Sequence, residues 1–456
     1  YTEMKQRYGK PMIAALLLAG TLAFTTQAQE QPAVPTLTLH DCMEYAISNS
    51  TKMRIEAADR KDEQWQRRQA IMEVFTPRIS AQTYANNQYG RNLDPETNTY
   101  NSVTTFYNGY NASASITLFD GFQLINNMKM ASTAAKMGVS KEQQKRDEIC
   151  LATMEAYYNV IYYSELAAVL EEQVATAKTA RDRAARQEEL GQKSHADVVQ
   201  MESELAQKQY QLTNARNQQK DATITLKDVM FWPVNEELTI DTEVSAPLLT
   251  PVQQAEVSEW AKQQLPSAKI AFLNVRNATL DLRKARGAFS PTISFSAGWS
   301  TTYFTYPGKE GYQTTSFGEQ FRNNRGEYIQ VSVSIPIYDQ LRRRTTLSLK
   351  KSAVRRAEAQ YDQALRDIEN EVARAINDRD GAHDAYRQAD QLADVQQEAF
   401  QLSTRQFETG LISAIEFQTA SQTYLNAMAE RMNALLKLRI KDAVVRYYNG
   451  ESYINQ

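Results

Sequence analysis

The segment Arg186-Gln187-Glu188-Glu189-Leu190-Gly191-Gln192-Lys193-Ser194-His195-Ala196-Asp197 is the most informative stretch of this chain. It occurs a second time as Arg405-Gln406-Phe407-Glu408-Thr409-Gly410-Leu411-Ile412-Ser413-Ala414-Ile415-Glu416. Both copies keep Arg, Gln, Glu, Gly, Ser and a final acidic residue in register. Upstream, residues 115–121 match residues 334–340, which are separated along the chain by the same distance as the two copies of the segment. Residues 75–80 match residues 289–294. A duplication on this scale decides the architecture, so we interpret the chain as two structural repeats, 37–245 and 246–449.

Very long amphipathic helices surround both copies of the segment. We predict helices over about 121–190 and 194–231 in the first repeat, and over about 339–408 and 413–448 in the second. Small apolar residues recur at spacings of three, four and seven, for example Ile368, Ala375, Ala382 and Ala389. This spacing is typical of a coiled-coil seam. A helix of this length spans roughly 100 Å at 1.5 Å per residue, so the protein is elongated, with tight turns at Gly191 and Gly410.

Four segments alternate between apolar and polar residues, at about 77–90, 103–119, 291–306 and 326–338. Period-two patterning of this length, rich in aromatic residues, favours barrel strands with one face toward lipid. A soluble sandwich gives the same alternation, but its strands are usually shorter. Polar loops are expected over 91–102 and 307–325. The residues expected at the strand–helix corners are Pro77, Asp120, Gly121, Pro291 and Asp339.

Four strands cannot close a membrane barrel. An open sheet in lipid leaves backbone groups unpaired, at several kcal/mol each. Two chains would supply eight strands, which make a barrel filled by its own side chains. Three chains would supply twelve strands, which suits a conduit, so we expect a homotrimer. Aromatic residues that could form girdles at the barrel ends are Tyr84, Tyr107, Tyr110, Phe119, Trp299, Tyr303 and Tyr338.

The N-terminal region and the composition limit the classes of function. Residues 1–28 combine basic residues, a short apolar run and a small-x-small site, as a cleaved secretory signal does. After it, no apolar run is long enough for a membrane-spanning helix. A net charge of -3 argues against nucleic acid as a partner. His40, His195 and His383 share no metal-ligand spacing, and Cys42 and Cys150 are expected to be buried thiols rather than a disulfide. No cofactor and no catalytic constellation is expected.

The duplicated corner after a strand, together with the duplicated Arg-Gln-x-x-x-Gly-x-x-Ser-x-x-Asp/Glu segment, resembles the TolC family of outer-membrane efflux proteins. The segment 37–46 resembles the first helix of that family, with Thr38 and Asp41 placed to form a capping box. The resemblance covers about residues 37 to 449. It implies a trimeric duct without catalytic activity, with a twelve-stranded barrel in the outer membrane and a helical tunnel in the periplasm. A periplasmic adaptor and an inner-membrane transporter, either proton-driven or ATP-driven, are the implied partners.

The resemblance also implies roles for residues at the helical tips. Asp197 and Glu416 match acidic positions that face the constriction, where three copies would supply a ring of carboxylates. They could equally be first-turn acids that stabilise their helices. Where well-known members have a tyrosine and an arginine, this chain has Phe407 and Ile412, so we predict hydrophobic closure of the tip. The turn residues expected to contact an adaptor are Gly191, Ser194, Gly410 and Ser413.

Two other classes of protein share some of these features with an exit duct. A periplasmic adaptor also carries a long helical hairpin, but it has one hairpin flanked by compact β domains, whereas this chain has two hairpins and long strands. A soluble coiled-coil scaffold is contradicted by the strands. The sequence leaves open the exported substrate, the class of pump and the resting state of the tip.

Overall fold

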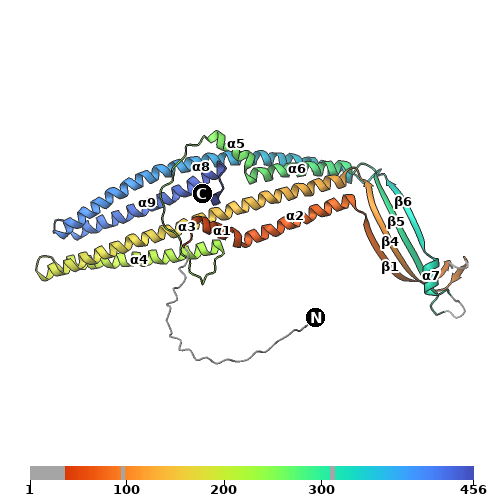
Figure 1. The fold of residues 1–456 in the computed structure, drawn as a ribbon, viewed down its shortest axis with the longest axis horizontal. Helices are drawn as coiled ribbons and strands as arrows, with labels where there is room; N and C mark the ends of the chain where they lie inside the picture. Colours follow the sequence, from red (N-terminus) through yellow and green to blue (C-terminus); the bar gives the residue numbers. More distant parts are fainter. Residues whose placement is uncertain (1–35, 94–97, 309–313, 456) are drawn as a thin grey trace, which may run out of the picture.

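The computed structural model describes residues 36–93, 98–308 and 314–455, so the expected signal peptide at 1–28 lies outside the described residues. The molecule is long and narrow. Figure 1 shows a four-stranded sheet at one end and the turns of two helical hairpins at the other. The described helices contain no segment that is both long enough and apolar enough to cross a membrane.

Two hairpins of long helices form most of the molecule. Helices α3 and α4 form the first hairpin, and α8 and α9 form the second. Shorter helices, α2 and α6, run from the middle of the molecule toward the sheet, where α2 packs on α3, α3 on α6 and α6 on α8. The bounds are α1 Leu39–Asn49, α2 Thr51–Phe75, α3 Gln123–Glu189, α4 His195–Met230, α5 Gln254–Gln264, α6 Pro266–Gly287, α7 Phe317–Asn323, α8 Arg342–Glu408 and α9 Ala414–Tyr448.

The local signals for these helices act as the sequence predicts. The Thr38 side chain and the Asp41 carboxylate form the predicted capping box at the start of α1. Ile368, with the alanines that follow it every seven residues in α8, is buried. Small side chains along a seam let helices approach closely, and this seam lies on the side of α8 that meets its neighbours.

The two cysteines lie where the helices meet in the middle of the molecule. Cys42 of α1 and Cys150 of α3 are both free and buried in one apolar cluster with Met154, Leu226 and Leu436. The expectation of two buried thiols is therefore confirmed. Burial raises the pKa of each thiol to about 12, so both remain protonated at neutral pH.

The sheet is antiparallel, with strand order β1-β4-β5-β6. Its strands are β1 Arg78–Gln88, β4 Thr105–Phe119, β5 Thr292–Thr305 and β6 Gly326–Ser334. Strand β6 stops before the expected end near residue 338, because Pro336 lacks the N–H that a continuing strand would use. The segments expected to be loops contain a short hairpin, β2 Arg91–Leu93 with β3 Tyr100–Ser102, and helix α7.

The register divides the sheet into an apolar face and a polar face. Residues directly opposite each other in antiparallel strands point to the same side. One such row joins Ile79, Ala114, Ala297 and Ile329 across the four strands. The neighbouring row joins Ser80, Ser113, Gly298 and Tyr328 on the other side. Tyr110, Trp299 and Tyr303 belong to the apolar face, whereas Tyr84 and Tyr107 belong to the polar face.

Two glycines on the polar face are covered by tyrosines. Tyr84 of β1 lies over Gly109 of β4, and Tyr328 of β6 lies over Gly298 of β5. A Cβ atom at either glycine would clash with the ring of its tyrosine. This cross-strand arrangement compensates for the lost side-chain packing of a glycine in a strand, and it occurs once in each half of the sheet.

Candidate functional site at the helical tips

Each hairpin turns at a glycine in the left-handed region. Gly191 has a φ of 70° and Gly410 a φ of 77°, a conformation that glycine adopts without steric cost. The turns end at Ser194 and Ser413, which are the N-caps of α4 and α9. In both copies of the Gly-x-x-Ser spacing, the glycine therefore forms the predicted tight turn and the serine begins the following helix.

Asp197 and Glu416 complete capping boxes with these serines. The Asp197 carboxylate accepts hydrogen bonds from the Ser194 hydroxyl at 2.8 Å and from its backbone N–H at 3.2 Å. The Glu416 carboxylate accepts from the Ser413 N–H at 2.8 Å and from the hydroxyl at 3.0 Å. The hydroxyl bond from Ser194 lowers the pKa of Asp197, and the backbone bond from Ser413 lowers that of Glu416. Both carboxylates are thus held at the hairpin ends and ionised at neutral pH, Glu416 on an exposed residue and Asp197 on a half-buried one.

Phe407 lies between the two hairpins, not on an open surface. Its side chain is only 3% exposed, and its ring stacks on Phe417 with centroids 4.8 Å apart. Ile412 packs at the edge of the same apolar cluster, which also contains Val198 and Met201 of α4. The cluster therefore holds the end of one hairpin against the end of the other. Whether Phe407 and Ile412 also border a constriction depends on neighbouring chains and stays a prediction.

Charged side chains flank this apolar contact. The Lys193 Nζ atom lies 3.9 Å from the centroid of the Phe407 ring, within the range of a cation–π interaction. The Arg183 guanidinium pairs with the Glu408 carboxylate at 2.9 Å. Each contact links α3 or its turn to α8, so the tips are joined by charge as well as by apolar packing.

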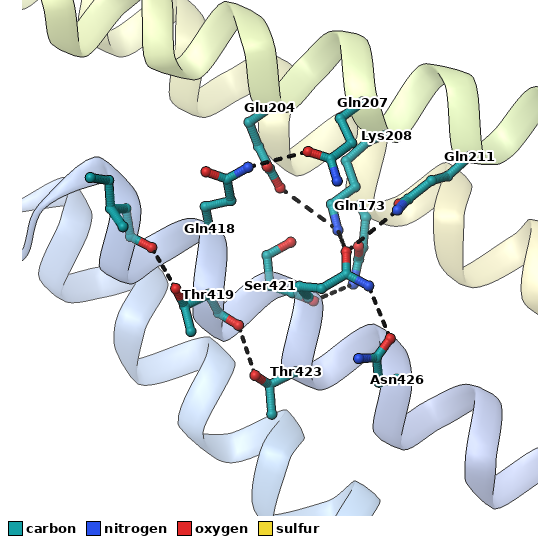
Figure 2. A network of polar contacts seen from close by, with 12 residues as sticks. Gln173, Glu204, Gln207, Lys208, Gln211, Gln418, Thr419, Ser421, Thr423 and Asn426 are labelled. Carbon is teal, nitrogen blue, oxygen red and sulfur yellow. Dashed lines mark hydrogen bonds and ion pairs between the residues drawn. The ribbon is translucent and has the colours of Figure 1, made fainter.

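A buried polar network joins the hairpins farther from the tips (Figure 2). Glu204 and Lys208 of α4 form an ion pair with 3.7 Å between the Nζ and Oε1 atoms, and their side chains are 2% and 1% exposed. The Lys208 ammonium also donates to the Gln422 Oε1 atom of α9 at 3.3 Å. Burial raises the pKa of Glu204 and lowers that of Lys208, because removal from water disfavours both charges.

Amide side chains surround this ion pair from three helices. Gln173 of α3 donates to the Ser421 carbonyl at 3.1 Å, and Gln200 of α4 donates to Gln418 of α9 at 2.8 Å. Gln418 in turn donates to Gln207 of α4. These hydrogen bonds cross from one hairpin to the other, so separation of the hairpins here would break them and expose the Glu204–Lys208 ion pair to water.

The predicted strand–helix corners lie at the opposite end of the helices. Asp120 accepts a hydrogen bond from the Leu124 N–H at 2.8 Å, and Asp339 accepts from the Arg343 N–H at 3.0 Å. Gly121 has a φ of 70°, and a Cβ atom there would clash with the Gly287 carbonyl of α6. Pro77 and Pro291 immediately precede β1 and β5. These residues therefore lie where the chain passes between the sheet and the helices.

The sequence did not reveal Lys193, the Arg183–Glu408 pair or the buried network. Glu and Lys four residues apart are common on solvated helix faces, so Glu204 and Lys208 gave no signal of burial. Among the residues that the structure describes, no group of three His, Cys, Asp or Glu side chains is arranged to hold a metal ion.

The sequence matches one family description over most of its length. The family described as "Outer membrane efflux protein" matches residues 43–230 and 257–450. Two curated proteins are also similar: "Protein CyaE" of Bordetella pertussis, 25% identical over 226 residues (49% of this chain, 45% of that protein), and "Outer membrane efflux protein BepC" of Brucella suis, 26% identical over 263 residues (57% of this chain, 53% of that protein). The chain thus spans about half the length of the curated relatives it matches.

Solved structures share the fold across nearly the whole chain. The structure of CusC covers 90% of this chain and 92% of its own, with a TM-score of 0.76 and 15% identity. The outer membrane protein VceC of Vibrio cholerae covers 91% of this chain and 96% of its own, with a TM-score of 0.74 and 14% identity. The MtrE outer membrane channel of Neisseria gonorrhoeae covers 91% of this chain and 89% of its own, at 0.73 and 17%.

Proposed function

The chain belongs to the outer membrane efflux protein family, to which the TolC family resemblance pointed, and from this premise we propose that it is the exit duct of a tripartite efflux pump or a type I secretion system. Three copies close a twelve-stranded barrel in the outer membrane, and their helices continue as a tunnel in the periplasm. The duct carries out no catalysis. A transporter of the inner membrane supplies the energy, and a periplasmic adaptor links it to the duct.

The observation that carries this proposal is the pair of free edges left by the internal repeat. Strand β4 of the first repeat pairs with β5 of the second. The equivalent pair, β6 with β1, is absent within the described chain, because these two strands are the outer edges of the sheet. Helices α2 and α8 are likewise the outer members of the helical layer. Pairing of β6 with β1 of a neighbouring copy satisfies both edges, and repetition of that contact closes a ring.

The repeat also predicts the register of this contact between chains. In the sequence matches between the repeats, Ser334 is equivalent to Ser115 and Gln82 is equivalent to Ser296. Because Ser115 pairs with Ser296, Ser334 should lie opposite Gln82 of the neighbouring chain. By the same rule, Val331 should lie opposite Ala85 of the neighbouring chain. This register keeps the apolar residues of both strands on one face, which would be the lipid side, and the polar residues on the face toward the lumen.

Disulfide cross-linking tests the closed ring. We expect Ala85→Cys with Val331→Cys in one chain to give dimers and trimers on oxidation, since opposite residues have Cβ atoms about 4.5–5.5 Å apart. Ala81→Cys with Val331→Cys keeps the same face but shifts the register, so it is the matched control. Cys42 and Cys150 are buried and should not react. Equal cross-linking in the two variants, or none in the first, would contradict the proposed assembly.

The tip residues are proposed to close the tunnel by apolar contact, with Asp197 and Glu416 as a carboxylate ring that favours cations. The support is the apolar cluster that contains Phe407 and borders Ile412. We expect Ile412→Asp to increase the ion conductance of the purified trimer in planar bilayers, since a partly buried carboxylate beside the apolar cluster would weaken the contact. Ile224→Asp, on an exposed face of α4, is the control. Unchanged conductance of the Ile412 variant would refute apolar closure.

The turns at Gly191, Ser194, Gly410 and Ser413 are proposed as the contacts for the adaptor. They are the exposed ends of both hairpins, and Leu190 and Leu411 beside them are 72% and 75% exposed. Apolar side chains at a projecting tip suit a partner that covers them. A photo-reactive residue at position 411 should cross-link to the adaptor in cells, whereas one at exposed position 210 in the middle of α4 should not.

A further inference from the structure

Helix α7 lies against the apolar face of the sheet, in a segment expected to be only a polar loop. Its two phenylalanines contact aromatic residues of the strands. Phe317 is 5.2 Å from Tyr303, and Phe321 is 5.6 Å from Trp299 and 5.4 Å from Tyr110, measured between ring centroids. All three partners belong to the apolar face. The helix thus places its aromatic side chains outside the wall, not in the lumen.

Hydrogen bonds fix α7 to the outer end of β5. Strand β6 begins opposite Ser300, so the following residues of β5 have no strand on that side. Gln320, which is 3% exposed, replaces the missing strand: its Oε1 atom accepts from the Phe304 N–H and its Nε2 atom donates to the Phe304 carbonyl, both at 3.0 Å. The buried Thr301 hydroxyl donates to the Phe321 carbonyl at 2.9 Å. The position of α7 is therefore specified by the fold.

The exposed side of α7 carries Phe317 together with the acidic Glu319 and the basic Arg322. Phe317 is 47% exposed although it packs on Tyr303. Arg322 and, just beyond the helix, Arg325 are exposed. Aromatic rings beside basic side chains are typical of the boundary between acyl chains and headgroups. This surface is continuous with the apolar face of the sheet and lies at the end remote from the helices (Figure 1).

We propose that α7 is a membrane-surface element that rests on the outside of the barrel and contacts the outer leaflet, with Phe317 at the boundary between acyl chains and headgroups. This inference rests on the proposed barrel. In this arrangement the aromatic girdle at the outer end of the barrel is formed by α7 as well as by the strands. Helix α7 then contacts lipid, not the lumen or a protein partner.

Fluorescence quenching by brominated phospholipids tests this position. The trimer is reconstituted in bilayers whose bromine atoms lie either near the headgroups or deep in the acyl chains. The reporter is Phe317→Trp in a chain whose own tryptophans, Trp65, Trp232, Trp260 and Trp299, are replaced by phenylalanine. We expect stronger quenching by the shallow bromines than by the deep ones, and weak quenching by aqueous acrylamide. Phe321→Trp, which should follow the same order, is the second reporter if the first variant fails to assemble.

Two controls separate failure of this inference from failure of the barrel. Trp299 of β5, kept as the single native tryptophan, should be quenched by brominated lipid if the apolar face of the sheet meets the bilayer. Tyr210→Trp, at a 68% exposed position of α4, should be quenched only by acrylamide. Quenching at Trp299 together with acrylamide-only quenching at position 317 would overturn the role of α7 alone. Absence of lipid quenching at both positions would overturn the proposed barrel.

Discussion

Replacement of Lys208 by methionine should strongly destabilise the contact between the hairpins. Lys208 and Glu204 are both almost fully buried, with 3.7 Å between their charged atoms. Methionine fills similar space but leaves the Glu204 carboxylate in the interior without its counter-charge. Loss of one partner from a buried ion pair typically costs about 3–5 kcal/mol. We therefore expect the free energy of unfolding to fall by about that amount for each chain.

The assay is denaturation by guanidinium chloride, followed by the helical circular-dichroism signal of the purified protein in detergent at fixed protein concentration. The matched control is Lys441→Met. Lys441 pairs with Asp378 at a shorter distance, 2.7 Å, but both side chains are substantially exposed, so its loss should cost at most about 1 kcal/mol. The two variants thus compare a buried pair with a solvated one.

A double variant completes the test. Glu204→Leu with Lys208→Met removes both charges, and replacement of a buried pair by apolar residues is often neutral or stabilising. Recovery of most of the lost stability would show that the unpaired carboxylate caused the loss. If Lys208→Met cost no more than Lys441→Met, water would reach this network and the burial argument would be refuted.

Two further predictions concern the middle of the molecule and the corner near the sheet. Asp147 is 7% exposed and accepts a hydrogen bond from the Tyr447 hydroxyl, and burial raises its pKa above the ordinary 3.8. Between pH 3.8 and that raised pKa the unfolded chain loses the Asp147 proton more readily than the folded chain, so the folded state loses stability across this window and does not regain it at higher pH. Asp147→Asn should therefore raise the thermal midpoint at pH 7, and a gain that persisted unchanged below pH 3.8 would contradict this cause. Gly121→Ala should lower the free energy of unfolding by more than about 2 kcal/mol, because the left-handed conformation costs an alanine about 1–2 kcal/mol and the new Cβ atom also clashes with the Gly287 carbonyl. Gly191→Ala is the control, since position 191 has open space around it and bears only the conformational cost. Equal losses of stability for the two variants in denaturation experiments would show that the structure relaxes around the contact with Gly287.

The elements that follow from local rules could be predicted from the sequence. The capping box of Thr38 needs only neighbouring residues, and the alternation around Ile293 and Phe295 needs only the period of a strand. The features that were missed depend on distant parts of the chain. Glu204 and Lys208 are buried because Gln418 and Gln422 of α9 lie opposite them, and no spacing in α4 reveals this.

The predicted polar loop after β5 shows the same limit. Ser316 caps α7, but the helix is short, and its docking depends on Tyr110 in the first half of the chain. The position of Phe407 in the repeated segment predicted that it lies at the tip. Its burial between hairpins results from Phe417 and Lys193, which come from the following helix and from the other hairpin. Local patterns therefore predicted elements, whereas contacts between hairpins required the three-dimensional structure.

The unpaired edges of β1 and β6 have a genetic consequence. In the proposed ring every member must be intact, so a chain that keeps β6 but carries a disrupted β1 would join an assembly and prevent its closure. If such chains make up half of the pool and mix freely, only about one-eighth of three-membered rings contain sound copies alone. A lesion in β1 should therefore be dominant over the normal allele, whereas loss of the whole polypeptide should be recessive.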